Sequence, residues 1–194
     1  MFRRALAILA FSLALATTGC GHADSSGGSS MTGAKVDAAV NSSGMKSAHF
    51  TADGFIASGA AKYAFTGDGD MQATPVSAMR LNLDLQTYTY LGAVTFHIID
   101  IGRRTYTQIG AGAWTSSPDT TTFPPGTPTD YIGEETRAGV KVWHTEAVSD
   151  GHVADEWVRE SDGYIVYMTF TDAGGNTFDL LFVSYNDSPV IAAP

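Results

Sequence analysis

Few side chains in this chain have the type and spacing that catalysis or metal binding requires. The five histidines form no HxH or HExxH pair, which are the spacings that place two imidazoles on one metal. They are His22, His49, His97, His144 and His152. His22 is expected to be solvated and His97 to face the polar side of a strand. His144 shares a face with Val140 and Val142, so a hydrogen-bonded core histidine is the better interpretation.

The acidic residues are equally poor candidates. Asp68-Gly69-Asp70 begins like a calcium loop, but the continuation and the later Glu are missing, so the segment is predicted to be a turn. Glu134-Glu135 and Asp155-Glu156 are sequence neighbours, and neighbours in a strand point to opposite faces. No G-x-S-x-G elbow or phosphate-binding glycine loop occurs. We therefore expect no enzyme, no metal site and no cofactor.

The one residue with a clear chemical prediction is Cys20, the only cysteine. Arg3 and Arg4 precede an apolar run from Ala5 to Ala16, and the small residues Thr17-Thr18-Gly19 follow. This order is typical of a secretory signal peptide. Because an unpaired thiol is a liability in an exported protein, a cysteine at the cleavage site is best explained by acylation. The alternative is an ordinary signal with an incidental cysteine, since Thr17 stands where Leu, Val or Ile is usual.

These features divide the chain into three parts. Residues 1–19 are predicted to be the signal peptide, whose run of about 12 apolar residues is shorter than the ~20 that span a membrane. Residues 20–33 are Ser/Gly-rich and are predicted to be a flexible, lipid-anchored tether. Residues 34–194 are predicted to fold as one domain. Membrane attachment would come from the acylated Cys20, with the domain on the outer face of the cell membrane.

The charge balance excludes one class of partner. The whole chain carries −9, and removal of Arg3 and Arg4 leaves 9 basic against 20 acidic residues, a net charge of −11. Nucleic-acid binding requires clustered Lys and Arg, so no nucleic-acid partner is expected.

The hydrophobic periodicity predicts one helix followed by strands. Thr32 is expected to cap a short helix that carries Val36, Ala39 and Val40 and ends near Gly44. From Lys46 onward the period is two. Strands are predicted over residues 47–56, 61–71, 78–87, 94–101, 103–109 and 114–115, with a bulge where the pattern changes phase from Ile98 to Ile99.

The second half begins with the Pro/Thr-rich segment Ser116–Asp130, which is predicted to be a long irregular loop. Strands then resume over residues 139–148, 152–159, 163–172, 176–184 and 189–192. Phe178–Val183 is apolar on both faces, so this strand is placed centrally. The fold class is mainly β: a single curved antiparallel sheet that forms an open half-barrel, with a short N-terminal helix.

Such a sheet has one apolar face for a single small helix to cover, which leaves room for an apolar ligand. The expected cavity-lining residues come from three strands. They are Met79, Leu81, Leu83, Leu85, Phe96, Ile98, Leu180 and Phe182. Tyr88 and Tyr90 are expected at the rim, where an aromatic ring with a polar tip suits a boundary between water and an apolar interior.

Several segments resemble one family. Ser47–Thr51, Ile132–His144, Glu156–Val166 and Ser184–Asp187 are similar to strand and turn patterns of the actinobacterial LppX/LprA/LprF/LprG lipoproteins. The resemblance covers residues 35–194 and implies a half-barrel related to LolA and LolB, with a hydrophobic cavity that carries lipid or lipoglycan. This chain departs from the family at Ser116–Asp130, where helices that plug the half-barrel are expected.

The resulting hypothesis is a lipid-anchored envelope protein that binds or transfers lipid or glycolipid in an apolar concave cavity. The alternative is an envelope sensor or interaction module that binds a protein partner through a sheet edge or the Pro-rich loop, without cargo.

Overall fold

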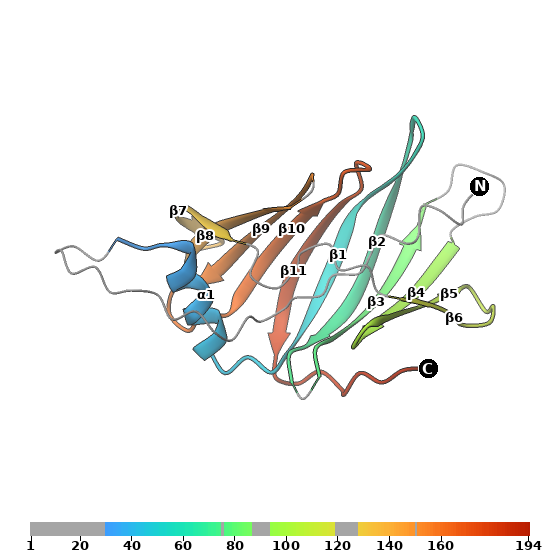
Figure 1. The fold of residues 1–194 in the computed structure, drawn as a ribbon, viewed down its shortest axis with the longest axis horizontal. Coiled ribbons are helices and arrows are strands. Elements are labelled where there is room, and N and C mark those ends of the chain that lie inside the picture. Colours follow the sequence, from blue (N-terminus) through green and yellow to red (C-terminus); the bar gives the residue numbers. More distant parts are fainter. Residues whose placement is uncertain (1–29, 75, 87–93, 119–127, 150) are drawn as a thin grey trace.

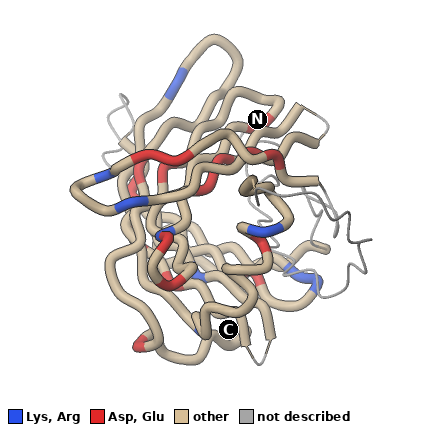
Figure 2. The backbone as a smooth tube through the Cα atoms, turned by 90° about the vertical axis from the view of Figure 1, so that its left-hand side faces the viewer, with Lys and Arg blue, Asp and Glu red and all other residues tan. Residues whose placement is uncertain are grey.

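The computed structural model describes residues 30–74, 76–86, 94–118, 128–149 and 151–194. In this part of the chain, eleven antiparallel strands form one sheet, which does not close, and one helix lies over one end of it (Figure 1). The sheet is curved, so the predicted open half-barrel is confirmed. Figure 2 shows the backbone turned by 90°, with both acidic and basic residues along the tube.

Along the chain, one helix is followed by eleven strands. Their bounds are α1 Gly33–Ser42, β1 Ser47–Ser58, β2 Ala61–Gln72, β3 Ala78–Leu85, β4 Val94–Ile101, β5 Arg104–Ile109, β6 Thr115–Pro118, β7 Thr129–Arg137, β8 Val140–Ser149, β9 His152–Arg159, β10 Ile165–Thr171 and β11 Thr177–Tyr185. The spatial order is β6-β5-β4-β3-β2-β1-β11-β10-β9-β8-β7. The consecutive strands β6 and β7 therefore lie at opposite edges, and β1 and the predicted central strand β11 lie in the middle.

The helix is the one predicted from the sequence. Thr32 is its N-cap and accepts a hydrogen bond from the Lys35 amide, which satisfies one free donor of the first turn. Val36 and Val40 are buried against the sheet. The helix packs mainly on β7 and β8, so it covers that end of the sheet.

The face that α1 covers is called the inner face here, and the opposite one the outer face. The main core lies on the inner face and includes Phe50, Phe65, Leu83, Met168 and Leu180. Strand alternation places the intervening polar residues on the outer face. A second, smaller core lies on the outer face, where Ile191 of the C-terminal segment packs with Ala78 and Ile99.

That second core explains why the bulge predicted at Ile98–Ile99 is wrong. The ladders of β4 with β3 and with β5 run without a register shift. Ile98 and Ile99 are both buried because the main core covers one face and Ile191 the other. The register shifts instead at His49/Phe50, Tyr131/Gly133 and Ile165/Tyr167.

The turn predicted at Asp68-Gly69-Asp70 is also wrong, because this segment is regular strand in β2. The glycines are needed for packing. A Cβ atom on Gly69 would lie 2.5 Å from the Phe50 ring and one on Gly67 would lie 3.0 Å from the Leu83 side chain. The missing side chains leave the space that these larger residues fill.

Three boundaries differ around the Pro-rich segment and the C-terminus. Residues 116–118 belong to β6 and residues 129–130 to β7, where an irregular loop was predicted, and residues 131–137 of β7 were not predicted to be a strand. Residues 119–127 lie outside the described part. β7 is an exposed edge strand, so it lacks the apolar alternation by which a strand is found. The strand predicted over residues 189–192 is absent, because this described segment packs through Ile191 without joining the sheet.

Candidate functional site

The four predicted residues of β3 lie side by side on the inner face. Met79, Leu81, Leu83 and Leu85 are all buried, with 6, 1, 1 and 5% of their surface exposed. They alternate with Arg80, Asn82 and Asp84, which are half-buried or exposed on the outer face. The alternation fixes the register, because a shift of one residue would expose all four apolar side chains.

The other four predicted residues share this face. Phe96 and Ile98 of β4 pair directly with Leu83 and Leu81 in the ladder. Leu180 and Phe182 come from β11, on the far side of β1 and β2, and Phe182 contacts Phe50 edge to face with ring centroids 5.6 Å apart. The sheet thus brings all eight into one buried apolar cluster. Whether a ligand contacts them stays a prediction.

Three predicted positions lie outside the described residues: Cys20 and the rim residues Tyr88 and Tyr90. The same holds for the signal peptide and for residues 20–29 of the tether.

One carboxylate on the inner face was not singled out from the sequence. Glu156 of β9 lies between Ala154 and Val158, which share its face and are buried. Burial, and secondarily the negative charge of Asp37 on α1, raises the pKa of Glu156 to about 7. Burial also raises the pKa of Asp37, and a hydrogen bond from the Thr129 side chain partly offsets this rise. A Glu at an inner position of an apolar strand is the signal that could have found it.

The outer face carries a dense cluster of paired polar groups at the β7–β10 end. His144 Nδ1 lies 3.1 Å from Glu135 Oε1 and His144 Nε2 lies 2.9 Å from Asp155 Oδ1. The ring stacks on Trp157 at 4.3 Å, and Trp157 Nε1 donates to the same Glu135 oxygen. The Arg137 guanidinium lies 3.9 Å from the Trp157 ring centre. His144 is hydrogen-bonded as predicted, but it lies on the outer face.

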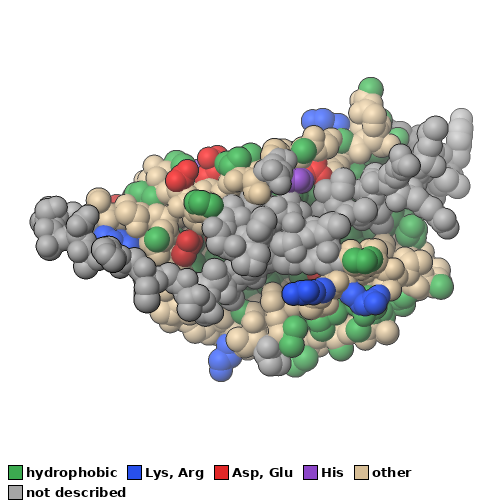
Figure 3. Space-filling model, viewed as in Figure 1, with side chains coloured by type: hydrophobic (Ala, Val, Ile, Leu, Met, Phe, Trp, Pro, Cys, Tyr) green, Lys and Arg blue, Asp and Glu red, His purple; other side chains and the backbone are tan. Residues whose placement is uncertain are grey.

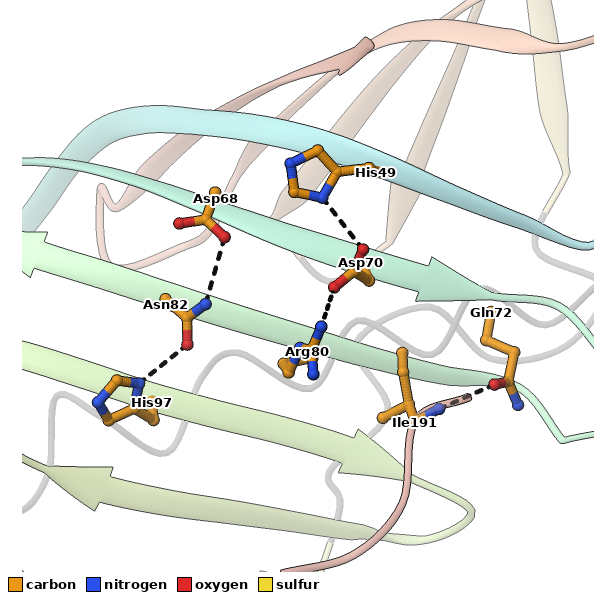
Figure 4. Close-up of polar contacts among 8 residues, drawn as sticks. All are labelled: His49, Asp68, Asp70, Gln72, Arg80, Asn82, His97 and Ile191. Carbon is orange, nitrogen blue, oxygen red and sulfur yellow. Dashed lines mark hydrogen bonds and ion pairs between the residues drawn. The ribbon is translucent and has the colours of Figure 1, made fainter. Parts of the chain in front are cut away.

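A second polar ladder runs over β1–β4 on the outer face (Figure 4). Asp70 accepts from Arg80 and lies 3.0 Å from His49 Nδ1, and His97 pairs with Asn82 at 2.9 Å. Burial works against ionisation of Asp70, but the hydrogen bonds from Arg80 and His49 outweigh it and hold the pKa of Asp70 below its usual value. The Ile191 amide donates to Gln72 Oε1, which attaches the C-terminal segment to this ladder.

Neither cluster has the arrangement of a metal centre. In the described ranges, no group of three or more His, Cys, Asp or Glu side chains is placed to hold a metal ion. The helix between residues 33 and 42, the one helix described, is too short to cross a membrane. Asp155 and Glu156 point to opposite faces, as predicted for neighbours in a strand.

Comparison with known proteins supports the fold and goes no further. No protein-family model matches the sequence, and no curated protein matches it significantly. Among solved structures, an uncharacterized conserved protein from Thermus thermophilus has a TM-score of 0.53 at 12% identity, covering 81% of this chain and 88% of that one. LprF from Mycobacterium bovis matches at a TM-score of 0.45 and 12% identity, covering 85% of this chain and 99% of that one.

A LolA-superfamily protein from Nitrosomonas europaea matches at a TM-score of 0.39 and 9% identity, covering 82% of this chain and 96% of that one. The matched structures thus include the groups to which the sequence segments are similar. The open half-barrel that the sequence resemblance implied is the architecture observed in the sheet.

Proposed function

We propose that this protein is a cell-envelope lipoprotein that binds lipid or glycolipid on the inner face of its half-barrel. One observation carries the proposal: the eight predicted residues belong to one continuous apolar cluster that lies on one face of an open sheet. Among the described elements, one helix of ten residues lies over this face, and it packs on β7 and β8.

The proposed mechanism is passive. Transfer of an acyl chain from water to an apolar surface gains about 0.8 kcal/mol for each buried CH₂ group, so a chain of ordinary length supplies enough free energy for binding. No covalent chemistry is required, which agrees with the paired state of the outer-face histidines. In this proposal residues 1–19 are removed, acylated Cys20 and residues 20–33 tether the domain to the outside of the membrane, and residues 34–194 hold the cargo.

A pair of variants tests the use of the inner face. Leu83→Trp adds an indole on the inner face, where Leu83 is 1% exposed, whereas Leu181→Trp adds one on the outer face of β11, where Leu181 is 51% exposed. We expect Leu83→Trp to reduce the uptake of a fluorescent fatty acid at least tenfold while the far-ultraviolet circular dichroism spectrum is kept, and Leu181→Trp to leave uptake unchanged. Loss of the folded spectrum in Leu83→Trp alone would indicate a filled core and favour the protein-partner alternative.

A further inference from the structure

Two carboxylates on the inner face have no cation beside them among the described residues. Glu156 is deep in the protein, and burial is the largest cause of its raised pKa, yet part of its surface remains accessible to solvent. Glu156 is therefore buried among its neighbours but not fully enclosed. Within the described ranges, neither Glu156 nor Asp37 has an ion pair with Lys, Arg or His. Figure 3 shows acidic side chains near the α1 end of the face on view.

Asp37 is held in place by close backbone contacts at both ends of α1. A Cβ atom on Gly33 would lie 1.8 Å from the Thr129 carbonyl oxygen, so the first turn approaches β7 as only glycine permits. Gly163 also approaches the helix closely, since a Cβ atom on it would lie 2.5 Å from the Ala39 carbonyl oxygen. The two contacts fix the helix, and with it the Asp37 carboxylate, over the inner face of the sheet.

A third polar group beside them also has an unmet hydrogen-bonding capacity. Thr145 of β8 pairs with Glu156 of β9 in the ladder, so both side chains project from the inner face. Thr145 is 1% exposed, and its hydroxyl oxygen has no hydrogen-bond partner among the described residues. Buried hydroxyls are nearly always paired, so this one requires an explanation. The unpaired hydroxyl is an observation independent of the two carboxylates, and it lies at the same part of the inner face.

We propose that Glu156, Asp37 and Thr145 bind the ammonium headgroup of an amphiphile whose hydrocarbon chain lies along the inner face. This inference rests on the proposed function and names the headgroup class of its ligand. An ammonium group has three N–H donors and no acceptor, so it matches three oxygens that can all accept. Its charge is opposite to that of the two carboxylates, and the attraction is strongest where water is excluded. A carboxylate headgroup would add a third negative charge, and an alcohol would leave the carboxylates without a cation.

The test compares three ligands of equal chain length on the full-length protein. Decylamine, decanol and decanoate are tested for displacement of the neutral probe N-phenyl-1-naphthylamine at pH 8, the two charged ligands below their critical micelle concentrations and decanol below its solubility limit. We expect decylamine to bind at least about tenfold more tightly than decanol and decanoate to bind most weakly. A tenfold difference in affinity corresponds to roughly the contribution of one charge-assisted hydrogen bond.

Matched variants locate the preference. Glu156→Gln and Asp37→Asn each remove one carboxylate charge, and each is expected to reduce the preference of decylamine over decanol to about threefold or less. Glu146→Gln removes the same charge from the outer face of β8, next to Thr145, and is expected to change nothing. The use of two variants keeps the test valid if one of them fails to fold.

The outcomes separate the two proposals. Equal binding of decylamine and decanol, tighter binding of decanoate, or a preference for decylamine that survives both inner-face variants would overturn the ammonium site while lipid binding stands. Failure of all three ligands to displace the probe would contradict the proposed function, and the headgroup site with it.

Discussion

The two faces of the sheet come from the same strands and are built on opposite principles. On β3 the inner residues are Met79 and three leucines, and the outer residues are Arg80, Asn82 and Asp84. The outer polar groups are joined in networks such as Asp70–Arg80 and His144–Asp155, whereas the inner polar groups Glu156 and Thr145 have no such partners among the described residues. Polar residues on the outer face satisfy one another, whereas a buried polar group left unpaired on the inner face requires an explanation, which the proposed ammonium site supplies.

The largest expected effect comes from the inner face. Leu83→Ala removes a buried side chain from the middle of the apolar surface and should cost about 2–5 kcal/mol of unfolding free energy. Leu181→Ala, on the exposed outer face of β11, should change it by less than about 0.5 kcal/mol. Urea unfolding of both variants measures the difference. Equal effects would remove the distinction between the faces.

The next effect comes from the outer ladder. Asp70→Asn leaves Arg80 and His49 without their shared carboxylate and should cost about 2–3 kcal/mol at pH 7. Because the pKa of Asp70 is lowered in the folded protein, its stabilisation is present above the unfolded pKa and is lost as the pH falls through the folded one. The variant and the parent protein should therefore converge in stability as the pH falls below the folded pKa of Asp70, which lies under its usual value. A difference that persists there would show that the carboxylate charge is not the cause.

Glu156→Gln is expected to increase the free energy of unfolding, where Asp70→Asn decreases it. The folded pKa of Glu156 is raised to about 7, so ionisation costs folding free energy that grows as the pH rises from the unfolded pKa through 7. The variant should be more stable than the parent by roughly 1–2 kcal/mol at pH 8, after allowance for the solvent-accessible part of the side chain, and equal to it at pH 4. Thermal unfolding at the two pH values measures this. Glu146→Gln, on the outer face, should show no such pH dependence, and a gain at pH 4 would refute the account.

The smallest effect concerns the C-terminal segment. Gln72→Ala removes the acceptor for the Ile191 amide and should cost about 1 kcal/mol. Hydrogen exchange at Ile191 should speed up about fivefold if the segment is held at this point, as 1 kcal/mol implies. An unchanged rate would mean that the packing of Ile191 on Ala78 and Ile99 suffices.

The sequence predicted those parts of the fold in which local pattern and environment agree. α1 was predicted because Thr32, Val36 and Val40 meet the requirements of a cap and a buried stripe. β3 was predicted because polar and apolar residues alternate along it, as one of its faces is in contact with water and the other is buried. The eight inner-face residues follow from the same alternation, so their common face could be read from the sequence.

The remaining features depend on partners that are distant in the sequence. Gly67 and Gly69 are typical of a turn until Phe50 and Leu83 are known to fill their space. Ile99 breaks the alternation because Ile191, 92 residues later, covers the outer face. Asp37 and Glu156 meet only after α1 docks on the sheet, so their interaction has no signal in the sequence.

The most direct test of lipid binding is native mass spectrometry of residues 31–194, produced without the predicted signal peptide and anchor in a lipid-rich host and purified without detergent. The account predicts a stoichiometric additional mass that organic solvent extracts and that is identified as lipid. A bare protein that also takes up no fluorescent fatty acid would contradict it.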